Sequence, residues 1–151
     1  MKILKLINNE ATEENILKII QHIKDIETAE GLTQQEIEHK YTCGYCSSLV
    51  EMVQHFLPQC RSICFWSADD IAHFCIGIES QCSNSNEHKE LDYFDINGKK
   101  SFNEMAQWLA KEFNGDIRGI RTMEMPVSRE NKIQQKVYNS VHIEQTYEAT
   151  M

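Results

Sequence analysis

The first half of this chain contains a glycine-containing turn that leads directly into an amphipathic helix, with a cysteine at the junction. Residues 41–57 read YTCGYCSSLVEMVQHFL, which places Cys46 in the first turn of the helix. The free N–H groups and the positive dipole end of a helix stabilise a thiolate at this position. We therefore expect the pKa of Cys46 to lie below the value of about 8.5 for a free cysteine, as in a nucleophile. The apolar positions behind it have the spacing of a helix with one buried face: Leu49, Val50, Val53, Phe56 and Leu57.

Two strands are predicted further along the chain. Residues 73–79, HFCIGIE, alternate between apolar side chains on one face and a second set that begins with His73, which is typical of a half-buried strand. Residues 91–96, LDYFDI, predict a second strand that ends at the Asn97-Gly98 turn signal. The polar residues 80–90 between them predict a loop.

These strands supply a base and an orienting acid for the cysteine. An antiparallel hairpin with its loop centred near Asn84 places His73 directly opposite Asp95. In that register Asp95 fixes the tautomer and orientation of His73, and His73 takes the proton of Cys46. The sequence therefore predicts a catalytic triad of Cys46, His73 and Asp95.

The Gly-x-Cys at a helix start, the strand that opens with His and the Asp before a glycine turn together resemble the papain-like cysteine peptidase superfamily. The similarity is to its compact bacterial and phage variants and covers residues 42–106. It implies an α+β fold in which the nucleophile-bearing helix packs on a small antiparallel sheet with flanking helices. It also implies chemistry on amide, thioester or isopeptide bonds, with Cys46 as nucleophile, His73 as base and Asp95 as acid.

One position departs from this family pattern. Many relatives carry Gln or Asn shortly before the cysteine to complete the oxyanion hole, whereas Lys40 stands there in this chain. The expected oxyanion donors are therefore the backbone N–H of Cys46 and the side chain of Lys40 or Tyr41.

The cysteines allow two further interpretations. Cys43, Cys46, Cys60 and Cys64 have the number and nearly the spacing of a four-thiolate zinc site, but a helix fills the gap and Cys64 lies in an apolar strand. The Cys43-Gly-Tyr-Cys46 segment also has the form of a thioredoxin-like redox pair. Residues 33–40 predict a helix before this motif, where a thioredoxin fold has a strand.

Length and charge limit the class of protein. A chain of 151 residues suffices for one domain, and we expect residues 1–151 to form a single papain-like cysteine hydrolase domain. The formal net charge of -8 argues against nucleic acid or an anionic membrane as the partner. No apolar run reaches the roughly 18 residues of a membrane span, and no signal peptide is recognisable. We expect a protein that is cytoplasmic where it is synthesised, with delivery into another cell left open.

The remaining segments fit a mixed α+β chain. Amphipathic helices are predicted after the capping residues Thr12, Thr33 and Ser101. The segment 3–7 is apolar and compatible with either a strand or a helix. The other predictions are a strand over 61–66, a polar turn at Asp69-Asp70, a strand over 117–125, a helix capped by Ser128 that runs through Val141, and a frayed or edge-like tail over 144–151.

The function expected from the sequence is that of a cysteine-dependent hydrolase or acyltransferase acting on amide or peptide bonds of a protein substrate. Peptidase, glutamine deamidase and transglutaminase-like reactions share the first half-reaction. A bacterial effector or toxin with a neutralising or activating partner protein fits by analogy of fold. No metal or cofactor is expected. A catalytically inactive binding module on the same fold is the alternative from another class, because the upstream Gln or Asn is missing.

Overall fold

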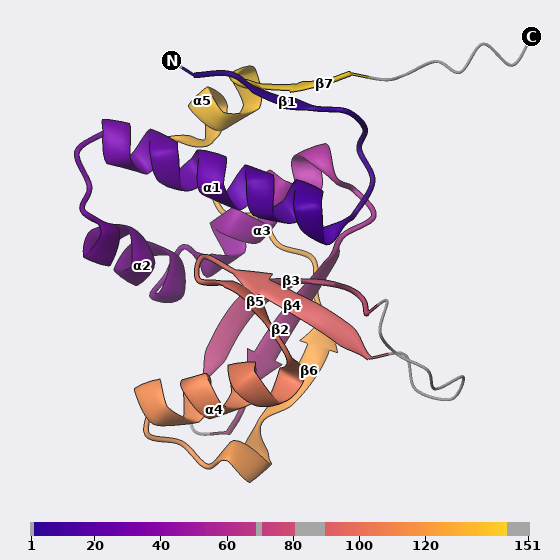
Figure 1. The fold of residues 1–151 in the computed structure, drawn as a ribbon. Coiled ribbons are helices and arrows are strands. Elements are labelled where there is room, and N and C mark those ends of the chain that lie inside the picture. Colours follow the sequence, from indigo (N-terminus) through magenta and orange to yellow (C-terminus); the bar gives the residue numbers. More distant parts are fainter. Residues whose placement is uncertain (1, 69–70, 81–89, 145–151) are drawn as a thin grey trace, which may run out of the picture.

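The protein is built from an upper helical layer, a twisted antiparallel sheet and one further helix on the opposite face of that sheet (Figure 1). The computed structural model describes residues 2–68, 71–80 and 90–144. The predicted turn at 69–70, most of the predicted loop 80–90 and most of the predicted tail 144–151 lie outside these ranges. In chain order the elements are β1 (Leu4–Leu6), α1 (Glu13–Ala29), α2 (Gln34–Thr42), α3 (Cys46–Phe56), β2 (Arg61–Trp66), β3 (Ala72–Glu79), β4 (Leu91–Asp95), β5 (Gly98–Lys100), α4 (Phe102–Glu112), the 3-10 turn η1 (Ile117–Gly119), β6 (Arg121–Glu124), α5 (Gln134–Asn139) and β7 (Val141–Ile143).

The main sheet has the strand order β5-β4-β3-β2-β6, and all its neighbouring strands run antiparallel. A separate parallel pair joins β1 to β7, so the two ends of the described chain lie side by side above α1 (Figure 1). The α+β class with a helix-covered antiparallel sheet is thus confirmed. Within the described residues, no helix has the length and apolar character needed to cross a membrane.

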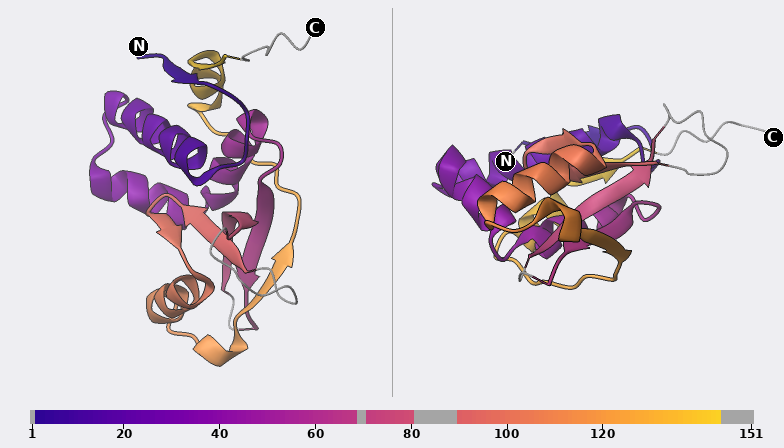
Figure 2. Two further views of the ribbon diagram at one scale, coloured as in Figure 1. Left: turned by 45° about the vertical axis from the view of Figure 1, so that its right-hand side comes forward. Right: turned by 90° about the horizontal axis from the view of Figure 1, so that it is seen from below.

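The alternation predicted for β3 separates two apolar clusters. Ile76 and its neighbour Phe94 on β4 face the upper layer and pack with residues of α1, α2 and α3. Cys75 and Tyr93 face the other way and pack with Leu109 and its neighbours on α4. Figure 2 shows α4 lying across this second face of the sheet. The helix that carries Cys46 and the helix α4 therefore approach β3 from opposite sides.

Three of the four long helices begin at the capping residues predicted from the sequence. The side chain of Thr12 accepts the N–H of Asn15, and Thr33 and Ser101 each form a complete capping box. Helix α3 differs, because its N-cap residue Tyr45 makes no side-chain capping hydrogen bond. The N-terminus of α3 therefore offers free N–H groups beside Cys46.

Two predictions for the C-terminal third were wrong. The segment 117–125 is not one strand, because Asp116 accepts the N–H of Arg118 and starts the turn η1, leaving only β6 as strand. Ser128 does not cap a helix, and α5 begins at Gln134 instead. Val141 belongs to β7, because its segment pairs with β1 from the other end of the chain.

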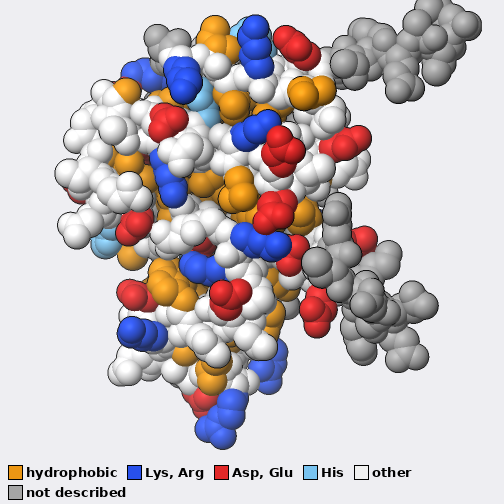
Figure 3. Space-filling model, viewed as in Figure 1, with side chains coloured by type: hydrophobic (Ala, Val, Ile, Leu, Met, Phe, Trp, Pro, Cys, Tyr) orange, Lys and Arg blue, Asp and Glu red, His pale blue; other side chains and the backbone are white. Residues whose placement is uncertain are grey.

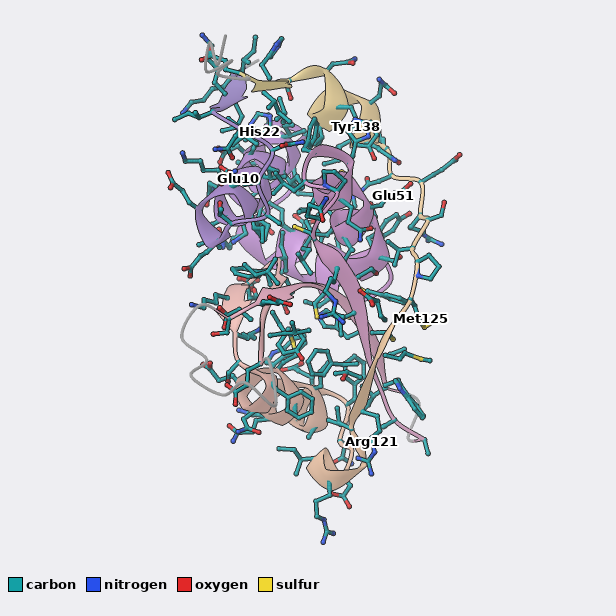
Figure 4. The ribbon with its side chains drawn as sticks, turned by 90° about the vertical axis from the view of Figure 1, so that its right-hand side faces the viewer. Glu10, His22, Glu51, Arg121, Met125 and Tyr138 are labelled. Atoms are coloured by element: carbon teal, nitrogen blue, oxygen red, sulfur yellow. The ribbon has the colours of Figure 1, made fainter. Side chains whose placement is uncertain are left out.

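The segment between β6 and α5 runs along the side of the molecule. Figure 4 places Arg121 at one end of this path, Met125 beside the sheet and Tyr138 at the opposite end, with Glu51 of α3 facing it. The carboxylate of Glu51 accepts the N–H of Arg129 at 2.8 Å. This connection ties the C-terminal elements to the helix that carries Cys46.

Candidate active site

The sulfur of Cys46 occupies a gap in the hydrogen bonding of β3. The N–H of Ser80, just after β3, donates to the carbonyl of Glu90. In an antiparallel pair every second residue directs its N–H toward the same neighbouring strand, so the N–H of Phe74 also points toward β4. Strand β4 ends at Asp95 before it reaches Phe74. The N–H of Phe74 donates instead to Cys46 Sγ, at 3.5 Å. The end of one strand thus makes room for the nucleophile candidate beside its neighbour.

His73 precedes Phe74 in β3 and points to the opposite face of the sheet. It is fully buried, and its Nε2 lies 3.2 Å from Asp95 Oδ2. The other ring nitrogen, Nδ1, is buried without a hydrogen-bond partner among the described residues. Nδ1 is therefore the nitrogen left to exchange a proton with the thiol of Cys46.

The hairpin register differs from the predicted one by two residues. Ile76 pairs with Phe94, so continuation of the same register puts Asp95 beside Cys75 rather than opposite His73. A shift of two residues keeps His73 and Asp95 on the same face, because side chains alternate with a period of two. Diagonal neighbours on one face remain within reach of long side chains. The predicted contact therefore forms although the predicted pairing was wrong.

The two carboxylate oxygens of Asp95 have different partners. Oδ1 accepts the N–H of Asn97 at 2.8 Å and closes the turn into β5, where Gly98 has a φ of 99°. Oδ2 accepts from His73 and lies 3.4 Å from Nζ of Lys100. The turn that follows Asp95 thus fixes the carboxylate that orients His73.

The charges of the site favour an ion pair between Cys46 and His73. Burial alone raises the pKa of Cys46, but its contact with His73 and the N–H of Phe74 outweigh burial, and the net pKa is lowered. Burial lowers the pKa of His73, but Asp95 and Cys46 outweigh it and raise the pKa to about 9. Burial likewise opposes ionisation of Asp95, whose pKa is lowered by His73 and Lys100. At neutral pH these shifts favour a thiolate beside an imidazolium.

The two predicted oxyanion side chains lie in a separate polar network. Lys40 forms an ion pair with the buried Glu27 at 2.6 Å and donates to Asn131 Oδ1 at 3.1 Å. Asn131 Nδ2 in turn donates to the hydroxyls of Tyr41 and Ser48, both at 2.9 Å. Within the described residues, neither Lys40 nor Tyr41 forms a hydrogen bond with Cys46. The structure thus joins Cys46, His73 and Asp95 but leaves the role of Lys40 and Tyr41 in catalysis a prediction.

The other described cysteines differ from Cys46. Burial raises the pKa of the Cys60, Cys64 and Cys75 thiols, so they remain protonated. Cys43 is exposed at the end of α2. In the part of the chain that the structure describes, no group of three or more His, Cys, Asp or Glu side chains is placed to hold a metal ion. The four cysteines of the zinc hypothesis are therefore not gathered at one point.

Two residues of the site were missed in the sequence. Lys100 lies beside Asp95, and its Nζ is 4.6 Å from the centre of the Trp108 ring. The ring of Trp108 lies 5.4 Å from that of His73. The signal available for Lys100 was its position just after the turn that returns the chain alongside Asp95. For Trp108 the sequence held no such signal. Its place beside His73 can be seen only when α4 is known to cover the face of the sheet to which His73 points.

No family model matches this chain, and neither a curated protein nor a solved structure matches it. The face in Figure 3 carries interspersed acidic and basic side chains rather than one block of a single sign. The geometry of Cys46, His73 and Asp95 is therefore the basis for assigning a function.

Proposed function

We propose that this protein is a papain-like cysteine hydrolase or acyltransferase that acts on an amide bond of a protein substrate. The observation that supports this most strongly is the contact chain from Cys46 through His73 to Asp95. The cysteine lies at an uncapped helix start and interacts with His73, and Nε2 of His73 lies 3.2 Å from the carboxylate of Asp95. The carboxylate is itself held in a turn by the N–H of Asn97. This order of nucleophile, base and orienting acid is the arrangement that activates a thiol.

In the proposed reaction the Cys46 thiolate attacks the carbonyl carbon and forms a C–S bond. The His73 imidazolium gives its proton to the leaving amine as the C–N bond breaks, which leaves a thioester on Cys46. Neutral His73 then takes a proton from water, the hydroxide attacks the thioester, and the acid product leaves. His73 is again an imidazolium and Cys46 again a thiolate, so protons balance over the cycle.

The backbone at the start of α3 is suited to hold the oxyanion. Leu49 is the first residue whose N–H donates to a carbonyl of this segment, that of Tyr45, at 3.2 Å. Of the preceding N–H groups of the helix, that of Ser47 interacts with the sulfur of Cys46, and no side chain of the N-cap residue bonds the others. Donors of this kind stabilise negative charge that develops on the carbonyl oxygen.

Peptidase, glutamine deamidase and transglutaminase-like activities all use this first half-reaction. They differ in the amine that leaves and in whether water or a second amine receives the acyl group. We propose a protein substrate of restricted identity for this domain. A bacterial effector or toxin with a neutralising or activating partner protein remains part of this proposal, by analogy of fold.

Acylation by p-nitrophenyl acetate tests the proposal without knowledge of the natural substrate. We expect a burst of p-nitrophenol, an acetyl group on the peptide that contains Cys46, and slow turnover that disappears in His73→Ala. Cys46→Ala should show neither burst nor turnover. Acetylation of Cys43 in preference to Cys46, or a stable acetyl-Cys46 with no His73-dependent turnover, would contradict a hydrolase.

A further inference from the structure

The contact chain of the proposed active site continues beyond Asp95 to a lysine. Nζ of Lys100 lies 3.4 Å from Asp95 Oδ2, the same oxygen that accepts from His73. Asp95 is 1% exposed and Lys100 only 16%, so this is not a solvated surface pair. An ion pair this far from water is screened little and acts on its neighbours.

The fold holds Lys100 in this place from two directions. Lys100 pairs with Tyr93 across the β4–β5 hairpin, which returns the chain beside Asp95. Its ammonium lies 4.6 Å from the centre of the Trp108 ring, a cation–π distance, and Trp108 also packs near His73. Lys100 is therefore fixed between the carboxylate and an aromatic ring that covers the imidazole.

Its neighbour Lys99 shows that this placement is particular to Lys100. Successive residues of a strand point to opposite faces, and Lys99 pairs with Glu13 at 3.3 Å and lies 3.7 Å from Asp92. Lys99 thus carries the same charge on the same strand but contacts other carboxylates. It provides a matched control for a change at Lys100.

We propose that Lys100 is a positioning residue of the active site, the last member of a row of alternating charges formed by Cys46, His73, Asp95 and Lys100. This inference rests on the proposed function, because it concerns the ionisation of the same thiol. The row carries two negative and two positive charges when the thiol and imidazole form an ion pair. Without Lys100 the buried row would hold an excess negative charge, which disfavours the thiolate.

The groups that face this row support the assignment of the compensating charge to Lys100. The thiols of Cys64 on β2 and Cys75 on β3 are close enough to interact electrostatically with this row. Burial raises the pKa of both thiols, so they carry no charge at neutral pH. Helix α4 contributes the uncharged Trp108. Of the charged groups that the described residues place against Asp95, Lys100 is the cation besides His73.

Loss of the Lys100 charge should shift ionisation in a defined direction. In Lys100→Met the negative charge of Asp95 is no longer compensated, so the Cys46 thiolate becomes less favourable and the His73 imidazolium more favourable. Both pKa values should rise, by on the order of one pH unit for a unit charge at this separation. On the acid limb of the thiol titration, such a shift reduces the alkylation rate about tenfold.

The test measures the rate of Cys46 alkylation by iodoacetamide against pH, with peptide mapping, in the wild type, Lys100→Met, Lys100→Arg and Lys99→Met. We expect the acid limb of Lys100→Met to move to higher pH, while Lys100→Arg and Lys99→Met keep the wild-type limb. NMR titration of His73 in the same proteins should give a higher pKa in Lys100→Met. Lys100→Gln serves in the same way where the Met variant does not fold.

Two outcomes separate this inference from the proposed function. An unmoved acid limb and an unmoved His73 pKa in folded Lys100→Met would overturn the role of Lys100, because a merely structural lysine lowers stability without shifting either value. A wild-type Cys46 that titrates like a free cysteine, with His73 at its ordinary pKa, would overturn the ion pair itself and with it the proposed function.

Discussion

Asp95 Oδ2 lies 3.2 Å from Nε2 of His73, although the two residues are not paired in the ladder between β3 and β4. The contact is diagonal across two strands, and Asp95 reaches it because its other oxygen is held by the N–H of Asn97. A carboxylate fixed by its own turn has little freedom to leave the imidazole. The tautomer of His73 is therefore controlled by the local geometry of a hairpin end.

Replacement of Asp95 by Asn should separate the charge of this residue from its role in the turn. The amide oxygen can still accept the N–H of Asn97, so the fold should persist. The amide NH₂ then faces His73 and favours the tautomer with its proton on Nδ1, and the loss of charge lowers the pKa of His73. We expect the alkylation rate of Cys46 at pH 7 to fall by about tenfold or more.

Asp95→Ala is the companion variant. It removes the turn acceptor as well and leaves the N–H of Asn97 without its partner, at a cost of about 1–3 kcal/mol. Chemical denaturation should thus distinguish the two variants. Equal stability of Asp95→Asn and Asp95→Ala would show that the turn does not depend on this side chain.

Gly77 marks a close approach of two strands in the sheet. A Cβ at this position would lie 2.8 Å from Cγ1 of Ile63, an atom close to the backbone in a stiff, β-branched side chain. We expect Gly77→Ala to destabilise the protein by about 1–3 kcal/mol. The double variant Gly77→Ala with Ile63→Ala removes the clash, so denaturant unfolding should give a combined loss smaller than the sum of the two single losses. Strict additivity would argue against this contact.

Asn131 is expected to hold the connection between β6 and α5 against the helices α2 and α3. It donates to Tyr41 and Ser48 and accepts from Lys40, all from buried or partly buried positions. Asn131→Ala leaves these partners unsatisfied and should reduce the free energy of unfolding by about 1–3 kcal/mol. The exposed Ser128, which does not cap a helix, is the control, and Ser128→Ala should change stability by less than about 0.5 kcal/mol.

The Cys46–His73 ion pair should also alter the pH dependence of stability. In the unfolded chain His loses its proton near pH 6.5 and Cys near pH 8.5, whereas in the folded protein the pKa of His73 is about 9 and that of Cys46 is lowered. Between about pH 6.5 and pH 8.5 the unfolded chain carries one proton on this pair, on Cys46. The folded protein also carries one proton on the pair, on His73. The pair therefore contributes no slope in this window.

Cys46→Ala removes this compensation. Folded His73 then keeps a proton that the unfolded chain has lost, because Asp95 still raises its pKa, so stability falls as pH rises above about 6.5. The stability difference between Cys46→Ala and the wild type should change with pH by up to about 1.4 kcal/mol per pH unit. Urea unfolding at several pH values measures it, and a difference independent of pH would contradict the ion pair.

Local signals in the sequence predicted much of this fold. The caps at Thr12, Thr33 and Ser101 define where three helices begin, because they act through hydrogen bonds within one turn. The alternation of β3 correctly assigned His73 and Phe74 to different faces. Such features depend on neighbours that are close in the sequence.

The features that the sequence did not predict depend on distant contacts. Pairing of β1 with β7 joins the two ends of the chain, so nothing within residues 128–141 indicates that the predicted helix must end in a strand. The register of β3 and β4 is set by packing on both faces of the sheet, and symmetry about the loop missed it by two residues. Lys100 is the exception, because it lies only five residues after Asp95 and its ion pair follows from the predicted turn at Asn97-Gly98.

The pH dependence of Cys46 alkylation shows whether His73 activates Cys46. Iodoacetamide labelling with peptide mapping should show Cys46 reacting well below the pH of about 8.5 at which a free thiol ionises, and His73→Ala should lose this reactivity. Labelling of free N-acetylcysteine in the same buffers gives the reference for an ordinary thiol. If Cys46 reacts only above that pH, or reacts equally in His73→Ala, the two residues do not form a catalytic pair.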